Sequence, residues 1–97
     1  MIVTFADQGT EDIFNGKDTK VARRSLPLNL HRVAVRKLDW LNRARTLEDL
    51  KAPPSNHLEA LKGDLEGFWS IRVNDQYRII FEWREGNAYR VKITDYH

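Results

Sequence analysis

The polar residues best suited to acid–base chemistry gather in the last third of the chain and at its end. The set consists of Lys62, Arg72, Asn74, Arg78, Asp95, Tyr96 and His97. An imidazole, with an ordinary pKa of about 6.5, is the natural proton carrier at neutral pH, and Asp95 is placed in sequence to orient His97 or to bias its charge. If Arg78 shares one face of a sheet with Lys62 and the chain end, two cations, an imidazole, a carboxylate and a phenol lie close together.

Such a set matches the chemical needs of RNA cleavage. RNA supplies its own nucleophile, the 2′-OH. Cleavage then needs a base for that proton, an acid for the leaving 5′-oxygen and positive charge beside the phosphorane. The set supplies all three without a metal ion. Each residue also has an ordinary explanation: Arg78 can pair across strands with Glu82 or Asp95. Lys62 can be a turn lysine, and the last two residues can be a mobile tail.

Several other chemistries are disfavoured by what the sequence lacks. It has no cysteine, and its three histidines, His31, His57 and His97, are scattered without metal-ligand spacing. We find no phosphate-binding glycine loop and no context for a serine nucleophile, and we read His31 as a surface residue without a task. We therefore expect neither a metal ion nor a cofactor.

The bulk properties predict one small domain. The 97 residues, 41% of them apolar, suit a single core spanning residues 1–97. No apolar run approaches a membrane span of about 18 residues, and the start of the chain does not resemble a secretion signal. We expect a soluble protein that stays in the cytoplasm and does not contact a membrane.

The elements that must position the polar set are predicted to be three consecutive strands. Residues 68–73, 77–83 and 88–93 are rich in β-favouring residues, and Asn-Asp and Glu-Gly-Asn separate them. This pattern predicts an antiparallel meander. Alternation places one face on the core and exposes Arg72 and Arg78 on the other. Residues 1–5 predict a further strand that pairs with an edge of this sheet.

Helices are predicted before the meander. Thr10 can cap a short helix that closes at Gly16, and residues 17–24 predict a loop or frayed helix. From Ser25, a possible cap, apolar residues recur at three and four positions and predict one long helix ending near Ala44. Pro53 and Pro54 mark a connector with a turn at 47–50, after which residues 57–61 can enter the sheet. The predicted fold is α+β, a small, mostly antiparallel sheet with two N-terminal helices packed on one face.

Basic residues are concentrated in the middle of the chain. Residues 17–45 contain nine lysines and arginines against two aspartates, whereas the flanking segments are net acidic. A basic stretch of this kind is typical of a surface that meets a polyanion, and it also occurs on ordinary solvated helices.

The C-terminal residues resemble a known family. The motifs are LKGD at 61–64, WSIRVNDQYRI at 69–79 and DYH at 95–97, preceded by PPSNHLEALKG at 53–63. In this order and spacing they resemble the signature of HigB-type toxins, a branch of the RelE/ParE superfamily of bacterial toxin–antitoxin systems. The resemblance is close from about 56 to 97 and extends over nearly the whole chain.

This resemblance implies a RelE-like fold and a ribosome-dependent mRNA endonuclease that works in the 30S A site, uses the 2′-OH and so inhibits translation. Its implied partner is a cognate HigA-type helix-turn-helix antitoxin, through which alone it would reach operator DNA. By position, Lys62 and Arg78 would stabilise the transition state, and the terminal cluster Asp95, Tyr96 and His97 would complete the catalytic set. The residues expected to contact RNA are His57, Asn74, Arg72, Arg32 and Arg36.

Two positions depart from the family pattern. Some members have a histidine three residues before the lysine of LKGD, where this chain has Glu59. Positions 57 and 59 of a strand point to the same side, so His57 is a candidate substitute. Leu65 replaces a residue that is often basic in the family.

Two other functions remain open at this stage. One is a ParE-like, non-enzymatic inhibitor of DNA gyrase, against which the terminal DYH argues. The other is a module for antitoxin pairing and transcriptional control with weak toxicity. Which terminal residue is the general base, and which codons are preferred, is not decided by the sequence.

Overall fold

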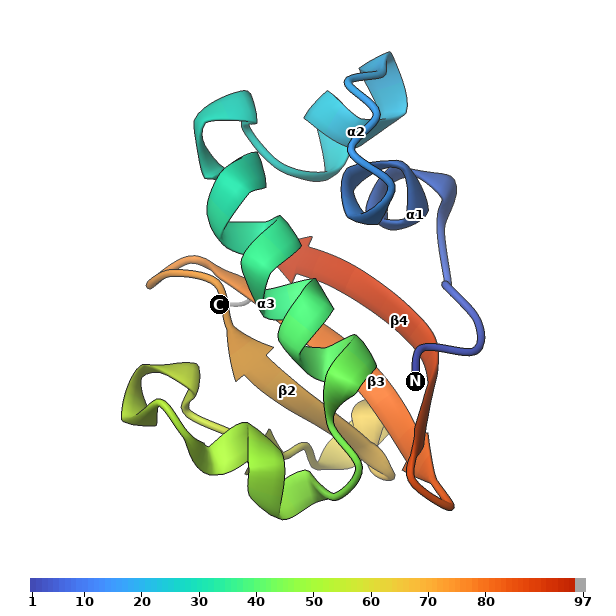
Figure 1. The fold of residues 1–97 in the computed structure, drawn as a ribbon, viewed down its shortest axis with the longest axis vertical. Helices are drawn as coiled ribbons and strands as arrows, with labels where there is room; N and C mark the ends of the chain where they lie inside the picture. The colour runs from blue at the N-terminus through green and yellow to red at the C-terminus, as the bar shows by residue number, and fades with distance from the viewer. Residues whose placement is uncertain (96–97) are drawn as a thin grey trace.

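The structure is a computed structural model that describes residues 1–95, and it has two layers (Figure 1). One layer is a four-stranded antiparallel sheet in the order β1-β2-β3-β4, with bounds Glu59–Ala60, Phe68–Arg72, Tyr77–Arg84 and Asn87–Asp95. The other contains α1 (Gln8–Phe14), α2 (Lys20–Ser25) and α3 (His31–Arg43). Short 3₁₀ turns link them: η1 (Leu28–Leu30), η2 (Leu47–Lys51), η3 (Pro54–Asn56) and η4 (Gly63–Leu65).

The predicted meander is confirmed, and its register defines two faces of the sheet. Ile71 lies opposite Ile79, which lies opposite Ile93 on the next strand. These side chains are buried in one cluster with residues of α3, so they define the face of the sheet that packs on this helix. Strand residues alternate between faces, so their neighbours point to the other side. The opposite face, here called the outer face, carries Ser70 and Arg72 on β2, Arg78 and Ile80 on β3, and Lys92 and Thr94 on β4.

The first residues of the chain pair with the sheet, as predicted. Two parallel bridges, Ile2 to Ala88 and Phe5 to Val91, place this segment beside β4 (Figure 1). The N–H of Val3 donates to the Ala88 carbonyl at 2.8 Å, and the N–H of Ala6 donates to that of Val91 at 2.8 Å. The segment therefore covers the edge of β4.

The prediction of one long helix from Ser25 is wrong. Ser25 is the last residue of α2, and Leu26 is extended with φ −160° and ψ 135°. Leu26 precedes Pro27, whose ring disfavours helical backbone in the residue before it. The chain therefore turns at Leu26, passes through η1 and restarts as α3, so three α-helices precede the sheet where two were predicted.

The short first helix is confirmed, with a different cap. Asp7 is extended, and its carboxylate accepts the backbone N–H of Thr10 at 2.8 Å. Thr10 is instead buried, and its hydroxyl oxygen accepts the backbone N–H of Ile93 at 2.9 Å. The predicted cap thus joins α1 to β4, while Gly16 follows the helix with φ +75°.

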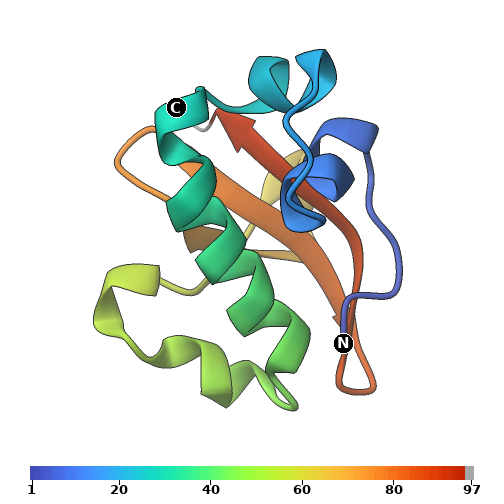
Figure 2. The same ribbon diagram turned by 45° about the horizontal axis from the view of Figure 1, so that its top comes forward.

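The core lies between α3 and the sheet. Ala34, Leu38 and Leu41 of α3 are fully buried and pack in one cluster with Ile79 and Phe81. Figures 1 and 2 show α3 lying across one face of the sheet, with η4 behind the other face. Burying each leucine contributes about 1.5–3 kcal/mol. No helix within residues 1–95 is long and apolar enough to cross a membrane.

Candidate functional site

The centre of the candidate site is Arg78, which the structure holds in a fixed position on the outer face. Its Nη1 lies 2.9 Å from Oε1 of Glu59, and its Nη2 donates to the backbone carbonyl of His57 at 2.6 Å. To reach them the side chain crosses β2 between Ser70 and Arg72. Ser70 is small and fully buried, which leaves room for the guanidinium.

The prediction that Arg78 is exposed is therefore wrong, although its face of the sheet is the predicted one. Only 7% of its side chain is exposed, because the segment that carries His57 and Glu59 covers it. Of its two expected cross-strand partners, Glu82 and Asp95, Glu82 contacts Arg90, with 3.4 Å between Oε1 and Nη1.

A buried asparagine fixes the covering segment. Asn56 ends η3, and its Nδ2 donates to the carbonyls of Leu50 at 3.2 Å and Ala52 at 3.3 Å. Its Oδ1 accepts a hydrogen bond from Nζ of Lys37 on α3. Sequence reasoning missed Asn56, whose polar side chain gave no sign that it would be fully buried.

Glu59 itself lies beside Arg78, at the position for which His57 was a candidate substitute. The argument that positions 57 and 59 point the same way on a strand is wrong, because His57 precedes β1 and adopts a left-handed conformation with φ 45°. His57 accepts a hydrogen bond from Arg78 through its backbone carbonyl, and the residue is exposed. Glu59, which we had noted only as a departure, is the carboxylate that pairs with Arg78.

Two of the other residues expected to contact RNA, Arg72 and Asn74, lie close to Arg78. The catalytic candidate Lys62 follows β1. Arg72 is the Cα partner of Arg78 across the strands and lies 3.5 Å from Asp75. Asn74 shapes the β2–β3 turn, since its Oδ1 accepts the N–H groups of Gln76 at 2.9 Å and Tyr77 at 2.8 Å. Lys62 is exposed, three residues after Glu59 and thus up to about 10 Å of extended chain away.

The predicted terminal cluster is only partly within the described residues. Asp95 is the last residue of β4, lies opposite Tyr77, and accepts a hydrogen bond from Nε2 of Gln76 at 3.0 Å. Thr94 is the residue opposite Arg78. Tyr96 and His97 lie outside the described residues, so the catalytic cluster stays a prediction.

The basic middle of the chain forms part of the helical surface. Arg32 and Arg36 are exposed and one turn apart on α3. Arg23 and Arg43, by contrast, are paired with Asp18 at 2.6 Å and Asp39 at 2.7 Å. The surface that carries Arg32 is therefore available to a polyanion.

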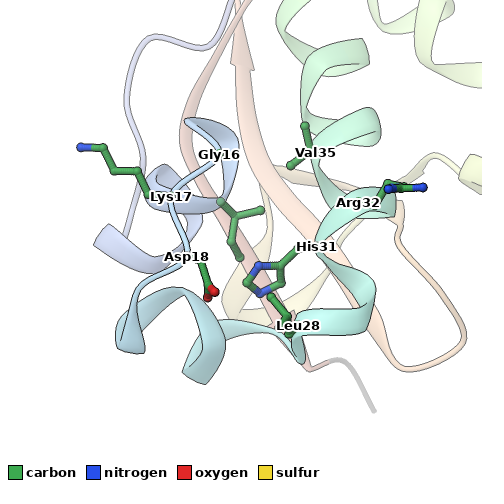
Figure 3. A pocket seen from close by; sticks show the side chains of 8 residues that line it. Gly16, Lys17, Asp18, Leu28, His31, Arg32 and Val35 are labelled. Carbon is green, nitrogen blue, oxygen red and sulfur yellow. The ribbon is translucent and has the colours of Figure 1, made fainter.

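A hollow of about 210 Å³ lies beside this surface, between the end of α1 and the start of α3. Figure 3 shows Arg32 and Lys17 extending away from the hollow and His31 turned into it. The Nε2 of His31 lies 2.8 Å from the Leu26 carbonyl. His31 thus helps to hold the α2–α3 junction, a structural task that we did not predict. The nearby pair of Arg23 with Asp18 holds the pKa of that carboxyl below its usual value.

Within residues 1–95, the site contains the Arg78 guanidinium, held by Glu59 and the His57 carbonyl, and few side chains that could transfer a proton. A guanidinium held by a carboxylate and a carbonyl does not need to reorganise when an anion arrives, which is the condition for electrostatic stabilisation of a developing charge. Its planar donors match phosphate oxygens well. The arrangement therefore suits a phosphate group, with proton transfer left to residues nearby.

Comparison with known proteins identifies close relatives. A model of the family described as RelE-like toxin of type II toxin–antitoxin system HigB matches residues 3–97. Toxin HigB-1 of Vibrio cholerae is 41% identical over 88 residues, which cover 91% of this chain and 90% of the relative. Endoribonuclease HigB of Proteus vulgaris is 50% identical over 40 residues, 41% of this chain and 44% of that protein.

Solved structures support the same fold. YafQ of Escherichia coli superposes with a TM-score of 0.57 at 10% identity, over 98% of this chain and 93% of that one. A YoeB/ParE toxin from Agrobacterium tumefaciens gives 0.53 at 17% identity, over 99% and 98%. These matches confirm the predicted fold class.

Proposed function

The chain belongs to the HigB family of RelE-like toxins of type II toxin–antitoxin systems, and from this premise we propose that it is an endoribonuclease that cuts mRNA on the ribosome. The observation that carries the proposal is the Arg78 guanidinium, fixed on the outer face by Glu59 and by the carbonyl of His57. The name of the Proteus relative, an endoribonuclease, supports the same activity.

The proposed reaction uses the substrate's own hydroxyl. A base in the terminal cluster of Asp95, Tyr96 and His97 takes the 2′-OH proton, and the 2′-oxygen attacks the adjacent phosphorus. An acid of the same cluster gives a proton to the leaving 5′-oxygen, so the products are a 2′,3′-cyclic phosphate and a 5′-hydroxyl. Arg78, held by Glu59 and the His57 carbonyl, places positive charge beside the non-bridging oxygens, and Lys62 adds a second positive charge.

The ribosome and an antitoxin are the proposed partners. The exposed Arg32 and Arg36 suit ribosomal RNA, because phosphate contacts by arginine dominate affinity for RNA. Membership of a toxin–antitoxin family implies a neutralising protein, and we propose a HigA-type helix-turn-helix antitoxin that brings the toxin to operator DNA. A toxin that acts on translating ribosomes works in the cytoplasm.

Expression in a bacterial host tests the proposal. We would induce the wild type, Arg78→Lys, His97→Gln and the matched control Arg84→Lys, which changes an exposed arginine at the far end of β3. Lysine keeps the charge of Arg78 but cannot keep both of its contacts. Circular dichroism would verify that each variant is folded.

The wild type and Arg84→Lys are expected to arrest growth and to leave mRNA cut within codons, whereas Arg78→Lys and His97→Gln are not. Arrest with intact mRNA and inhibited DNA gyrase would instead support the ParE-like function. Absence of arrest by a folded wild type would support a purely regulatory role.

A further inference from the structure

A second hollow lies on the outer face of the sheet and has no role in the proposed reaction. Its volume is about 200 Å³, and three adjacent strands contribute Phe68 from β2, Ile80 from β3 and Arg90 with Lys92 from β4. Leu65 of η4 and Ala6 of the N-terminal segment complete its lining. The hollow thus has apolar residues from four separate segments and two cations from one strand.

The register places this hollow next to Arg78 on the same face. Ile80 lies opposite Lys92, and Arg78 lies opposite Thr94, so the two rows are two residues apart. Two residues along a strand span about 7 Å and return to the same face. The backbone of Arg78 is therefore one row from the hollow, while its guanidinium extends across β2 toward Glu59, so an RNA chain that contacts Arg78 can also reach the hollow.

Charge on the outer face favours a polyanion. Arg72, Arg78, Arg90 and Lys92 lie on strands β2 to β4. The three arginines pair with Asp75, Glu59 and Glu82 in that order. Within residues 1–95, Lys92 is exposed and makes no ion pair.

Arg90 is held in place beside the apolar surface. Its backbone has φ 53°, and its N–H donates to Oγ1 of Thr4 at 2.8 Å. Its guanidinium carbon lies 5.4 Å from the centroid of the Phe68 ring, within cation–π range. The hollow therefore presents a half-buried aromatic ring with an exposed guanidinium over it.

We propose that this hollow binds one nucleotide of single-stranded RNA next to the phosphate held by Arg78. The base would pack against Phe68 and Ile80, and Lys92 would pair with the adjoining phosphate. Proteins commonly bind single-stranded RNA by stacking bases on aromatic side chains beside backbone cations, and sheet faces are used in this way. The inference rests on the proposed function and adds a second nucleotide contact to it.

A binding experiment with a modified RNA tests the subsite. The probe is a fluorescent oligonucleotide with 2′-O-methyl groups, which cannot be cut, read by anisotropy with the full chain. A matched probe lacks one base beside the phosphate at the cleavage position. The variants are Phe68→Leu, which keeps the apolar volume and removes the ring, Lys92→Gln, and the control Lys51→Gln on the distant connector.

Phe68→Leu is expected to weaken binding of the intact probe at least about fivefold and to leave binding of the probe without the base unchanged. Lys92→Gln is expected to weaken both probes and to lower the salt slope by about one, while Lys51→Gln changes neither. Equal effects of Phe68→Leu on both probes, or none, would overturn the subsite. So would unchanged RNA affinity with weaker binding of the antitoxin.

The two proposals fail separately. If the wild type binds the intact probe more tightly than the probe without the base but cuts no mRNA in cells, the subsite stands and the endonuclease proposal falls. If mRNA is cut but the missing base makes no difference to binding, the subsite falls alone.

Discussion

Asn56 ties the connector before the sheet to α3, and its replacement by alanine gives a direct measure of how firmly the Arg78 site is built. The side chain is fully buried and makes three hydrogen bonds: two to the carbonyls of Leu50 and Ala52, and one from the ammonium of Lys37. Each neutral bond contributes about 0.5–1.5 kcal/mol and the charged one about 1.5–3 kcal/mol. Since the two neutral bonds are long, we expect Asn56→Ala to lower the free energy of unfolding by about 3 kcal/mol.

Urea unfolding followed by tryptophan fluorescence at pH 7 would measure this loss. Ser55→Ala changes the exposed neighbour and is the control, with an expected change within about 0.5 kcal/mol. A double-mutant cycle with Lys37→Met isolates the bond to α3 and should give a coupling of at least about 1 kcal/mol. A loss no larger than that of Ser55→Ala, or a cycle without coupling, would refute this account of the connector.

Three smaller predictions concern other parts of the fold. Hydrogen bonds from Thr19 and Gln8 hold the pKa of Asp12 below its ordinary value of 3.8. The ionised carboxylate therefore stabilises the fold above pH 3.8, and this stabilisation is lost as the pH falls through the lower pKa of the folded state. Asp12→Asn should flatten the decline in urea stability below about pH 4, and an unchanged decline would contradict this. Gly9→Ala should lower the stability measured in thermal melts by about 1–3 kcal/mol, because the new Cβ would lie 1.9 Å from Oγ of Ser25 and 2.6 Å from the carbonyl oxygen of Val21. Adding Ser25→Gly should restore only part of the lost stability, because the contact with the Val21 carbonyl remains. A Gly9→Ala variant as stable as the wild type would disprove the close approach. Asn74→Ala removes two turn hydrogen bonds and should cost about 1–2 kcal/mol in urea unfolding; a loss of cleavage rate without loss of stability would show that this side chain serves RNA instead.

The sheet was predictable because its signals are local. The three strands of the meander show period-two alternation, and the Asn-Asp and Glu-Gly-Asn turns join them, so the meander follows from short-range patterns. The same local reasoning predicted one helix from Ser25 where the structure has the end of α2, a break and then α3. The apolar spacing continues through Leu26 and Leu30, but the backbone restriction before Pro27 breaks it, and spacing alone does not register that restriction.

The burial of Arg78 was not predictable, because it depends on a contact between residues far apart in sequence. Glu59 lies in a strand of two residues, too short to give an alternation signal, and it meets Arg78 only after the connector has folded back over the sheet. The resemblance to the family did single out this position, since Glu59 stands where some members are expected to have histidine. It did not reveal that a carboxylate there would pair with the arginine.

The pairing of the first residues with β4 has a consequence for the order of folding. The N–H of Val3 donates to the Ala88 carbonyl, and the N–H of Arg90 donates to Oγ1 of Thr4, 86 residues away. The first residues can therefore form these hydrogen bonds only after β4 has been synthesised. Such distant closures come late and slowly. During synthesis, Arg78 and β4 emerge after every helix, so a nascent chain cannot complete its outer face until β4 has left the exit tunnel. Products truncated before β4 would therefore lack part of the outer face, the surface on which the proposed activity depends.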